Sequence, residues 1–147
     1  MAPSFEIKMT CKHHLEQAKN NEQAARSIRD SYPDWAVTMC FYAALHLVEY
    51  YACVNGIDIA SQYPLSKSVH DSRRNYVIDF SYELRNKNLR KVYEDLEEES
   101  KVARYMKNIY INTEKYYNTK KYYTERKEKV TQSFQNLQQV KQILNID

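Results

Sequence analysis

Glycine and proline, the residues that tight turns most often require, are nearly absent from this chain. Its 147 residues contain one glycine and three prolines. A β-sandwich, a barrel or a doubly wound sheet needs many more turn residues, whereas long helices need few. A chain of this length also fits a single domain that buries roughly 70% of its unfolded surface. We therefore predict one all-α domain over residues 1–147, an up-and-down bundle of four to five helices.

The longest apolar run lies between Asp34 and Tyr51 and reads DWAVTMCFYAALHLVEYY. It is apolar around most of its circumference, which is typical of a helix that neighbours cover on several sides. A run of about 19 residues could also span a membrane. However, the run contains His46 and Glu49, and an ionised group in hydrocarbon costs several kcal/mol. We therefore predict a central bundle helix at about Pro33–Val54 and no membrane association.

Apolar residues at three- and four-residue spacing predict further helices over about residues 10–30 and 84–107. Ser68 is placed to cap a short helix that runs to about Phe80. Gly56 can take the left-handed conformation that ends the central helix. Residues 57–67 are expected to be irregular, and a last helix is expected over about residues 119–145.

Four apolar residues of that last helix lie seven positions apart: Tyr123, Val130, Leu137 and Leu144. This spacing is typical of a narrow seam that packs against a partner helix. We interpret the seam as a surface that a second copy of the chain covers, because tyrosines suit an interface. The pattern predicts a homodimer.

The three cysteines, Cys11, Cys40 and Cys53, are odd in number and occupy apolar positions. They are predicted to be reduced, buried thiols of a cytoplasmic protein rather than a disulfide framework. Cys11 with His13 and His14 does not predict a zinc site, since the two histidines point in different directions on a helix. A single glycine excludes a glycine-rich phosphate loop. We expect no metal and no cofactor.

His46 lies three residues before Glu49 on the central helix. In one interpretation the carboxylate tunes the imidazole for proton transfer. In the other, His46 is a buried histidine whose hydrogen bonds are satisfied by a neighbouring tyrosine or carboxylate. Both residues are candidates for a binding site.

His70, Arg73 and Arg74 follow at the spacing that places all three on one side of a helix. Arginine forks match phosphate in a bidentate way, so the cluster suits a phosphate ligand. Alternatively, Glu49 or another carboxylate neutralises the arginines in a structural network. We expect Arg73 to point inward towards Glu49, with His70 and Arg74 nearer the rim.

A nuclease that needs no metal requires a general acid or base and a cation near the reacting phosphorus. His70 or His46 together with Arg73, Arg74 or Arg104 would supply both groups. A second basic region interleaves lysines and arginine with tyrosines over Lys115–Lys129 and includes Lys120 and Lys121. Such a pattern suits single-stranded nucleic acid, although a solvated helix face has the same composition.

Three segments in order, DWAVTMCFYAALHLVEYYA, VHDSRRNYV and LRKVYEDLEEESKVARY, resemble the HEPN superfamily of small helical proteins. The resemblance covers about Asp34–Tyr105. It implies an up-and-down bundle of four or five helices that is usually dimeric. Family members act as metal-independent RNases in toxin–antitoxin and defence systems, or as non-catalytic partners of nucleotidyltransferases. This chain lacks the family's RNase signature, an arginine followed after four to six residues by a histidine.

Three hypotheses about function follow from these observations. The first is a HEPN-like binding or regulatory protein that handles RNA or a nucleotide, or that docks a nucleotidyltransferase partner. The second is a divergent metal-independent RNase that uses His70 with Arg73 and Arg74. The third is a structural helical adaptor.

Overall fold

The computed structural model describes residues 5–107 and 118–147, with side chains from residue 11 onward in the first range. These residues form helices and contain no strand, so the all-α class is confirmed. The described part of the chain contains seven helices: α1 (Phe5–Ile28), α2 (Pro33–Val54), α3 (Ile59–Gln62), α4 (Val69–Glu83), α5 (Lys87–Tyr105), α6 (Thr119–Thr124) and α7 (Lys127–Ile143). The predicted count of four to five is not matched, since the short helices α3 and α6 were not expected.

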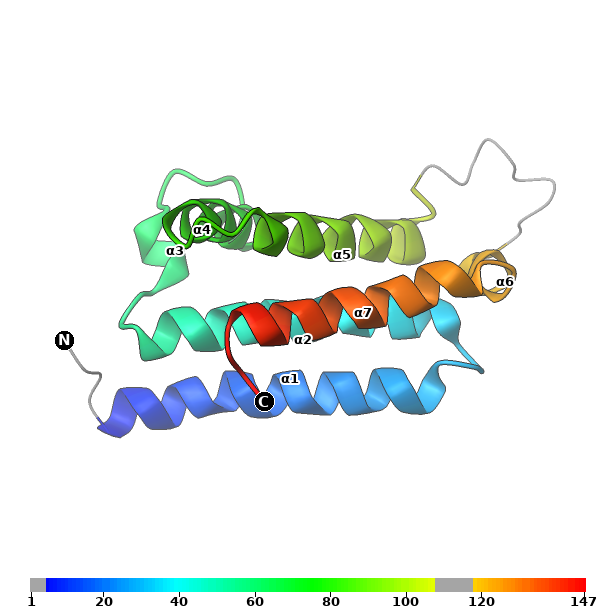
Figure 1. Cartoon of the computed structure of the whole chain (residues 1–147), viewed down its shortest axis with the longest axis horizontal. Coiled ribbons are helices and arrows are strands. Elements are labelled where there is room, and N and C mark those ends of the chain that lie inside the picture. Colours follow the sequence, from blue (N-terminus) through cyan, green and yellow to red (C-terminus); the bar gives the residue numbers. More distant parts are fainter. Residues whose placement is uncertain (1–4, 108–117) are drawn as a thin grey trace.

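Four long helices, α1, α2, α5 and α7, run side by side along the long axis of the molecule, and α4 crosses them near one end (Figure 1). Along the chain, α1, α2, α5 and α7 alternate in direction (Figure 1). The central position of α2 is confirmed, because it contacts α1, α4, α5, α6 and α7. Its Phe41 is fully buried and meets the ring of Tyr93 on α5 at 5.7 Å between centroids.

Within the described residues, α2 is the one helix long and apolar enough to cross a membrane. However, 56% of its most apolar window is buried inside the molecule. Burial of this kind is what a core helix of a bundle shows. The hydrophobicity of α2 is therefore accounted for by its contacts with neighbouring helices.

Local sequence signals placed several helix ends correctly. Pro33 opens α2, and the predicted range of that helix matches the structure. The Ser68 side chain caps α4 by accepting a hydrogen bond of 3.1 Å from the backbone N–H of Asp71. Gly56 has φ +77°, the left-handed conformation expected after α2.

The prediction of one continuous C-terminal helix is wrong. The chain breaks at Glu125 and Arg126, which separate α6 from α7. The seam of Tyr123, Val130, Leu137 and Leu144 is at most 4% exposed and belongs to the core of the single chain. Because α2 and α5 pack against α7, the seam leaves no apolar surface for a second copy to cover.

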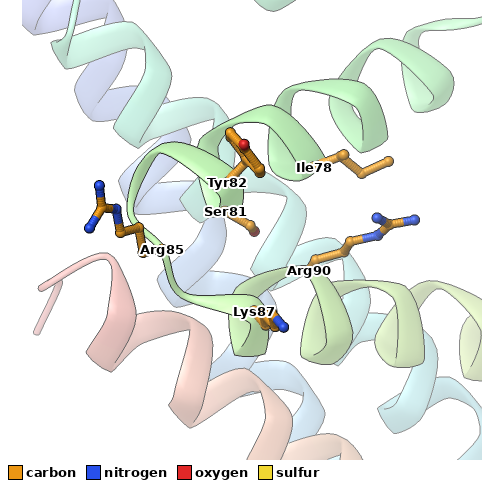
Figure 2. Close-up of a pocket in the computed structure, with 6 residues that line it drawn as sticks. All are labelled: Ile78, Ser81, Tyr82, Arg85, Lys87 and Arg90. Carbon is orange, nitrogen blue, oxygen red and sulfur yellow. The ribbon is translucent and has the colours of Figure 1, made fainter.

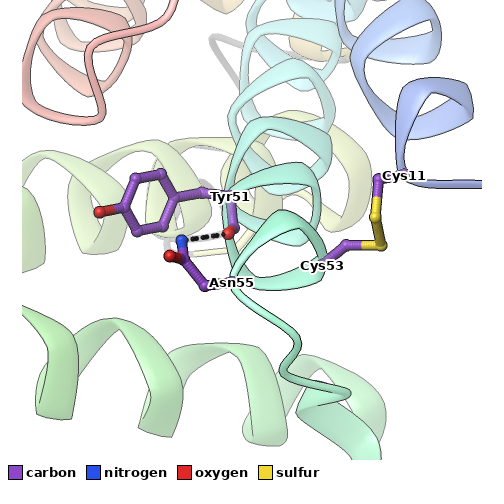
Figure 3. Close-up of a disulfide and its surroundings, with 4 residues drawn as sticks. All are labelled: Cys11, Tyr51, Cys53 and Asn55. Atoms are coloured by element: carbon purple, nitrogen blue, oxygen red, sulfur yellow. Dashed lines mark hydrogen bonds between the residues drawn. A yellow bond between two sulfur atoms is a disulfide. The ribbon is translucent and has the colours of Figure 1, made fainter. Parts of the chain in front are cut away.

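The prediction of three reduced thiols is wrong for two of them. Cys11 on α1 and Cys53 on α2 form a disulfide with a Cα–Cα distance of 5.5 Å (Figure 3). The two residues are 42 positions apart, and they meet because the start of α1 lies beside the end of α2. Cys40 is the buried free cysteine, and burial raises its pKa to about 12.

Opening the Cys11–Cys53 disulfide should lower the free energy of unfolding. A crosslink restricts the unfolded chain, and removing one typically costs about 2–4 kcal/mol. We expect a lower Tm by differential scanning calorimetry when the protein is reduced, and the same lower Tm for the Cys11→Ser/Cys53→Ser double variant with or without reductant. An unchanged Tm for protein that mass spectrometry shows to be reduced would contradict this.

Candidate functional site

The Arg73 guanidinium points inward from α4 to the carboxylate of Glu49 on α2. Its Nε lies 2.7 Å from Glu49 Oε1, and the two side chains are 18% and 16% exposed. The expected pairing of Arg73 with Glu49 is therefore confirmed. The charge of Arg73 is neutralised by a partly buried ion pair between the central helix and α4.

Arg74 lies between two carboxylates. Its Nη1 is 2.6 Å from Asp71 Oδ1, and its Nε is 2.8 Å from Oε1 of Glu97, a buried residue of α5. Hydrogen bonding to Glu97 is the main cause of the raised pKa of Arg74. Arg74 lies nearer the rim than Arg73, as expected, with its side chain 31% exposed against 18%. It is not a free cation, however, because α5 brings Glu97 against it.

His70 packs its ring near two aromatic side chains of α2, with centroids 6.1 Å from Phe41 and 6.3 Å from Tyr42. Its Nδ1 is buried and has no hydrogen-bond partner among the described atoms. Burial, followed by the nearby charge of Arg73, lowers the pKa of His70, and Glu97 opposes this shift. The imidazole is therefore held in its neutral form.

Arg104, at the end of α5, is bound by neutral groups. Its Nη1 donates to the hydroxyl of Tyr42 at 2.7 Å and to that of Tyr105 at 3.2 Å. The guanidinium carbon also lies 5.3 Å and 4.8 Å from the centroids of these two rings. Two further hydrogen bonds go to Ser100, one to its carbonyl and one to its hydroxyl. In residues 5–107 and 118–147, no carboxylate forms an ion pair with Arg104.

We call this group, His70, Tyr42, Ser100, Arg104 and Tyr105, the Arg104 site. Tyr42 connects its parts, since its ring is near the His70 imidazole and its hydroxyl accepts from Arg104. The sequence identified His70 and Arg104 but not the role of Tyr42. The available signal was that the FYAALH run places a polar hydroxyl in a mostly apolar stretch of the helix.

His46 has a partner that was not expected. Its Nδ1 lies 3.0 Å from Nδ1 of His14 on α1, and the two rings stack at 5.3 Å. Burial and then the neighbouring His14 lower the pKa of His46. One nitrogen of the pair must accept while the other donates, so at most one of these facing nitrogens carries a proton. His14, rather than a tyrosine or Glu49, is therefore the hydrogen-bond partner of His46 Nδ1. The charge of Glu49 still acts on the imidazole, because it raises the His46 pKa against the larger effect of burial.

The basic region shows only part of the predicted pattern. Lys120 and Lys121 are exposed on α6, and the Lys120 ammonium lies 4.9 Å from the ring centroid of Tyr32. Tyr123 is fully buried, and its hydroxyl donates to Glu99 at 2.7 Å. That ring is not available for base stacking. Residues 115–117 of the predicted region lie outside the described residues.

The described side chains contain no group of three or more His, Cys, Asp or Glu that could hold a metal ion. Comparisons with protein-family models, with curated proteins and with solved structures found no match for this chain. Membership of a family therefore remains a proposal that rests on the sequence resemblance.

Replacing Glu49 with glutamine should destabilise the fold, because the Arg73 charge would lose its counter-charge. Breaking a buried pair typically costs about 3–5 kcal/mol, and we expect about 2–3 kcal/mol here, since both side chains keep some exposure. Urea denaturation measures the change. Glu94→Gln, which breaks the exposed pair with Arg90, is the control and should cost under about 1 kcal/mol. Equal stability of wild type and Glu49→Gln would contradict this role.

The lowered pKa values of His70 and His46 predict a loss of stability in mild acid. The unfolded chain binds protons as the pH falls through the ordinary value of about 6.5, while the folded protein resists protonation to lower pH. The contribution of the two histidines to the free energy of unfolding is therefore complete above this pH. Below it, the free energy of unfolding decreases by at most about 1.4 kcal/mol per pH unit for each histidine. Urea denaturation at pH 7.5 and 5.5 should show a smaller decrease for His70→Gln than for wild type. An equal decrease in both proteins would refute the assignment.

Proposed function

We propose that this chain is a HEPN-like binding protein that handles RNA or a nucleotide, with Arg104 as the residue that meets a phosphate. The observation that carries the proposal is the uncompensated charge of Arg104. Its acceptors in the described structure, two hydroxyls of tyrosine and two oxygens of Ser100, are all neutral. Neutral acceptors fix the orientation of the guanidinium without cancelling its charge.

The surroundings of Arg104 also suit a nucleic-acid ligand. The guanidinium fork matches phosphate oxygens, and Tyr105 is 61% exposed. An exposed aromatic face next to a cation is the combination that binds single-stranded nucleic acid by stacking and charge. The neutral imidazole of His70 lies at the inner side of the same group through its contact with Tyr42.

A divergent RNase that uses His70 with Arg73 and Arg74 has less support. Carboxylates neutralise both arginines, so neither is free to stabilise charge on a reacting phosphate. Of the three candidate arginines, Arg104 is the one that forms no ion pair with a described carboxylate.

The resemblance further suggests a homodimer, a nucleotidyltransferase partner and a role in a toxin–antitoxin or defence system. We include these in the proposal, together with a cytoplasmic location. The Cys11–Cys53 disulfide removes the cysteine argument for that location, because such bonds are rare in reducing compartments.

The test is a binding titration with a short fluorescent single-stranded RNA and with a mononucleotide, followed by anisotropy or calorimetry. A hydrogen bond to a charged group is worth about 1.5–3 kcal/mol, so Arg104→Ala should weaken binding by about tenfold or more. Arg26→Ala is the control, because it removes the same charge from an exposed arginine that is already paired with Glu22.

Two results would overturn the proposal. One is an absence of binding to both ligands by the wild-type protein. The other is equal affinity in wild type and Arg104→Ala, with both folded by circular dichroism. Either result would favour the structural adaptor.

A further inference from the structure

A cavity separate from the Arg104 site lies between the C-terminal half of α4 and the first turns of α5 (Figure 2). Its volume is about 610 Å³, within the range of roughly 300–1,000 Å³ that small-ligand sites occupy. It is lined by Ile78, Ser81, Tyr82, Arg85, Lys87 and Arg90. It shares none of these residues with the Arg104 site. We call it the α4–α5 cavity.

The charge of this cavity is positive and largely uncompensated. Arg85 and Lys87 form no ion pair with any described residue, and Arg90 pairs only with Glu94 at 2.9 Å on the surface, where the side chains are 54% and 38% exposed. Exposed pairs of this kind contribute little and exchange readily. The nearby carboxylates of α4, Asp79 and Glu83, line a different pocket beside Tyr63. The α4–α5 cavity therefore presents cations without acidic neighbours in its lining.

The positive side chains at the start of α5 oppose the dipole of that helix. Lys87 is its first residue, Arg90 follows one turn later, and the first turn contains no acidic residue. The N-terminus of a helix carries partial positive charge and favours anions. Cations there lower the stability of the free protein, and an anion bound between them would relieve that repulsion. A local conflict of this kind is expected at a functional site.

Ser81 supplies an independent sign of a ligand. The residue is 5% exposed, and its hydroxyl has no hydrogen-bond partner in the part of the chain that the structure describes. Leaving a buried polar group without a partner is costly. Ser81 lines the cavity, and Figure 2 shows its hydroxyl directed towards the side on which Ile78 and Arg90 lie. A polar ligand atom in the cavity would satisfy it.

Tyr82 and Ile78 supply the apolar part of the cavity wall. Tyr82 is 87% exposed and is one of the residues that line the cavity. Aromatic rings prefer to stack on other planar groups. Arg85 points to the far side of the α4–α5 turn in Figure 2, so it contributes to the positive field rather than to a direct contact.

We propose that the α4–α5 cavity binds a small aromatic anion, a planar ring that carries one phosphate or carboxylate group. Lys87, Arg90 and the N-terminus of α5 hold the anionic group, the Ser81 hydroxyl donates to it, and the ring lies against Tyr82 and Ile78. The site is independent of the proposed function at Arg104.

The test uses phenyl phosphate and benzoate as probes. Inorganic phosphate, which has the anionic group without the ring, and phenol, which has the ring without the anionic group, are the controls. Calorimetry should show saturable binding of at least one aromatic anion, with an affinity about tenfold tighter than that of inorganic phosphate or phenol. The affinities of phenyl phosphate and benzoate identify which anionic group the site prefers. Amide NMR shifts on titration should concentrate in residues 78–90 and not near Arg104.

Variants assign the contacts. Lys87→Ala and Arg90→Ala should each weaken binding by about tenfold, whereas Lys91→Ala, an exposed lysine of α5 outside the lining, should not. Ser81→Ala should weaken binding several-fold while leaving the Tm of the free protein unchanged or higher, because the hydroxyl has no partner to lose. The Tm of every variant is measured without probe, which separates lost binding from lost folding.

Three results would overturn the proposal. The first is an absence of saturable binding by both aromatic anions. The second is binding as tight for inorganic phosphate or phenol alone. The third is binding that survives Lys87→Ala and Arg90→Ala but is lost in Arg104→Ala, which would place the ligand at the Arg104 site and support the proposed function instead.

Discussion

The structure depends on the burial of α2. This helix is apolar around most of its circumference and is covered by α1, α5 and α7, with α4 and α6 closing its ends. Such coverage removes water from the polar residues that α2 carries, and each of them must then find a partner within the protein. Glu49 meets Arg73 of α4, His46 meets His14 of α1, and Tyr42 meets Arg104 of α5. These three polar contacts between α2 and its neighbours are consequences of this burial.

Position relative to the helix interfaces also separates the cations that have a carboxylate partner from those that have none among the described residues. Arg73 and Arg74 lie where helices meet, and carboxylates neutralise both. Arg104 and Lys87 lie at the two ends of α5 without a carboxylate partner in the described structure. A helix of 19 residues spans roughly 28 Å, so the Arg104 site and the α4–α5 cavity are distinct places. Residues without a carboxylate partner in the described structure therefore lie at both ends of one helix.

Several features could be predicted from sequence because their causes are local. The scarcity of glycine and proline and the spacing of apolar residues predicted the all-α class and the position of α2. Ser68 and Gly56 acted through the backbone within a few residues of themselves. The pairing of Arg73 with Glu49 was also predictable, because a buried arginine requires an anion and the central helix offers one carboxylate in a suitable position. The break between α6 and α7 was not predicted, because the sequence there contains no glycine or proline.

Apart from Arg73 and Glu49, tertiary structure alone decided which distant residues meet. The sequence shows three cysteines at apolar positions, but only the alignment of α1 against α2 brings Cys11 to Cys53 and His14 to His46. The seven-residue seam was interpreted as a surface for a second copy of the chain, but the packing of α2 and α5 against α7 covers it within one chain. Glu97 reads as one acid in a charged run, yet it is buried against Arg74. The sequence by itself determined helices and their apolar faces, because these depend on neighbours along the chain. The disulfide, the ion pair of Arg74 with Glu97 and the lack of a carboxylate partner for Arg104 in the described structure depend on how the helices pack, which the order of residues does not state.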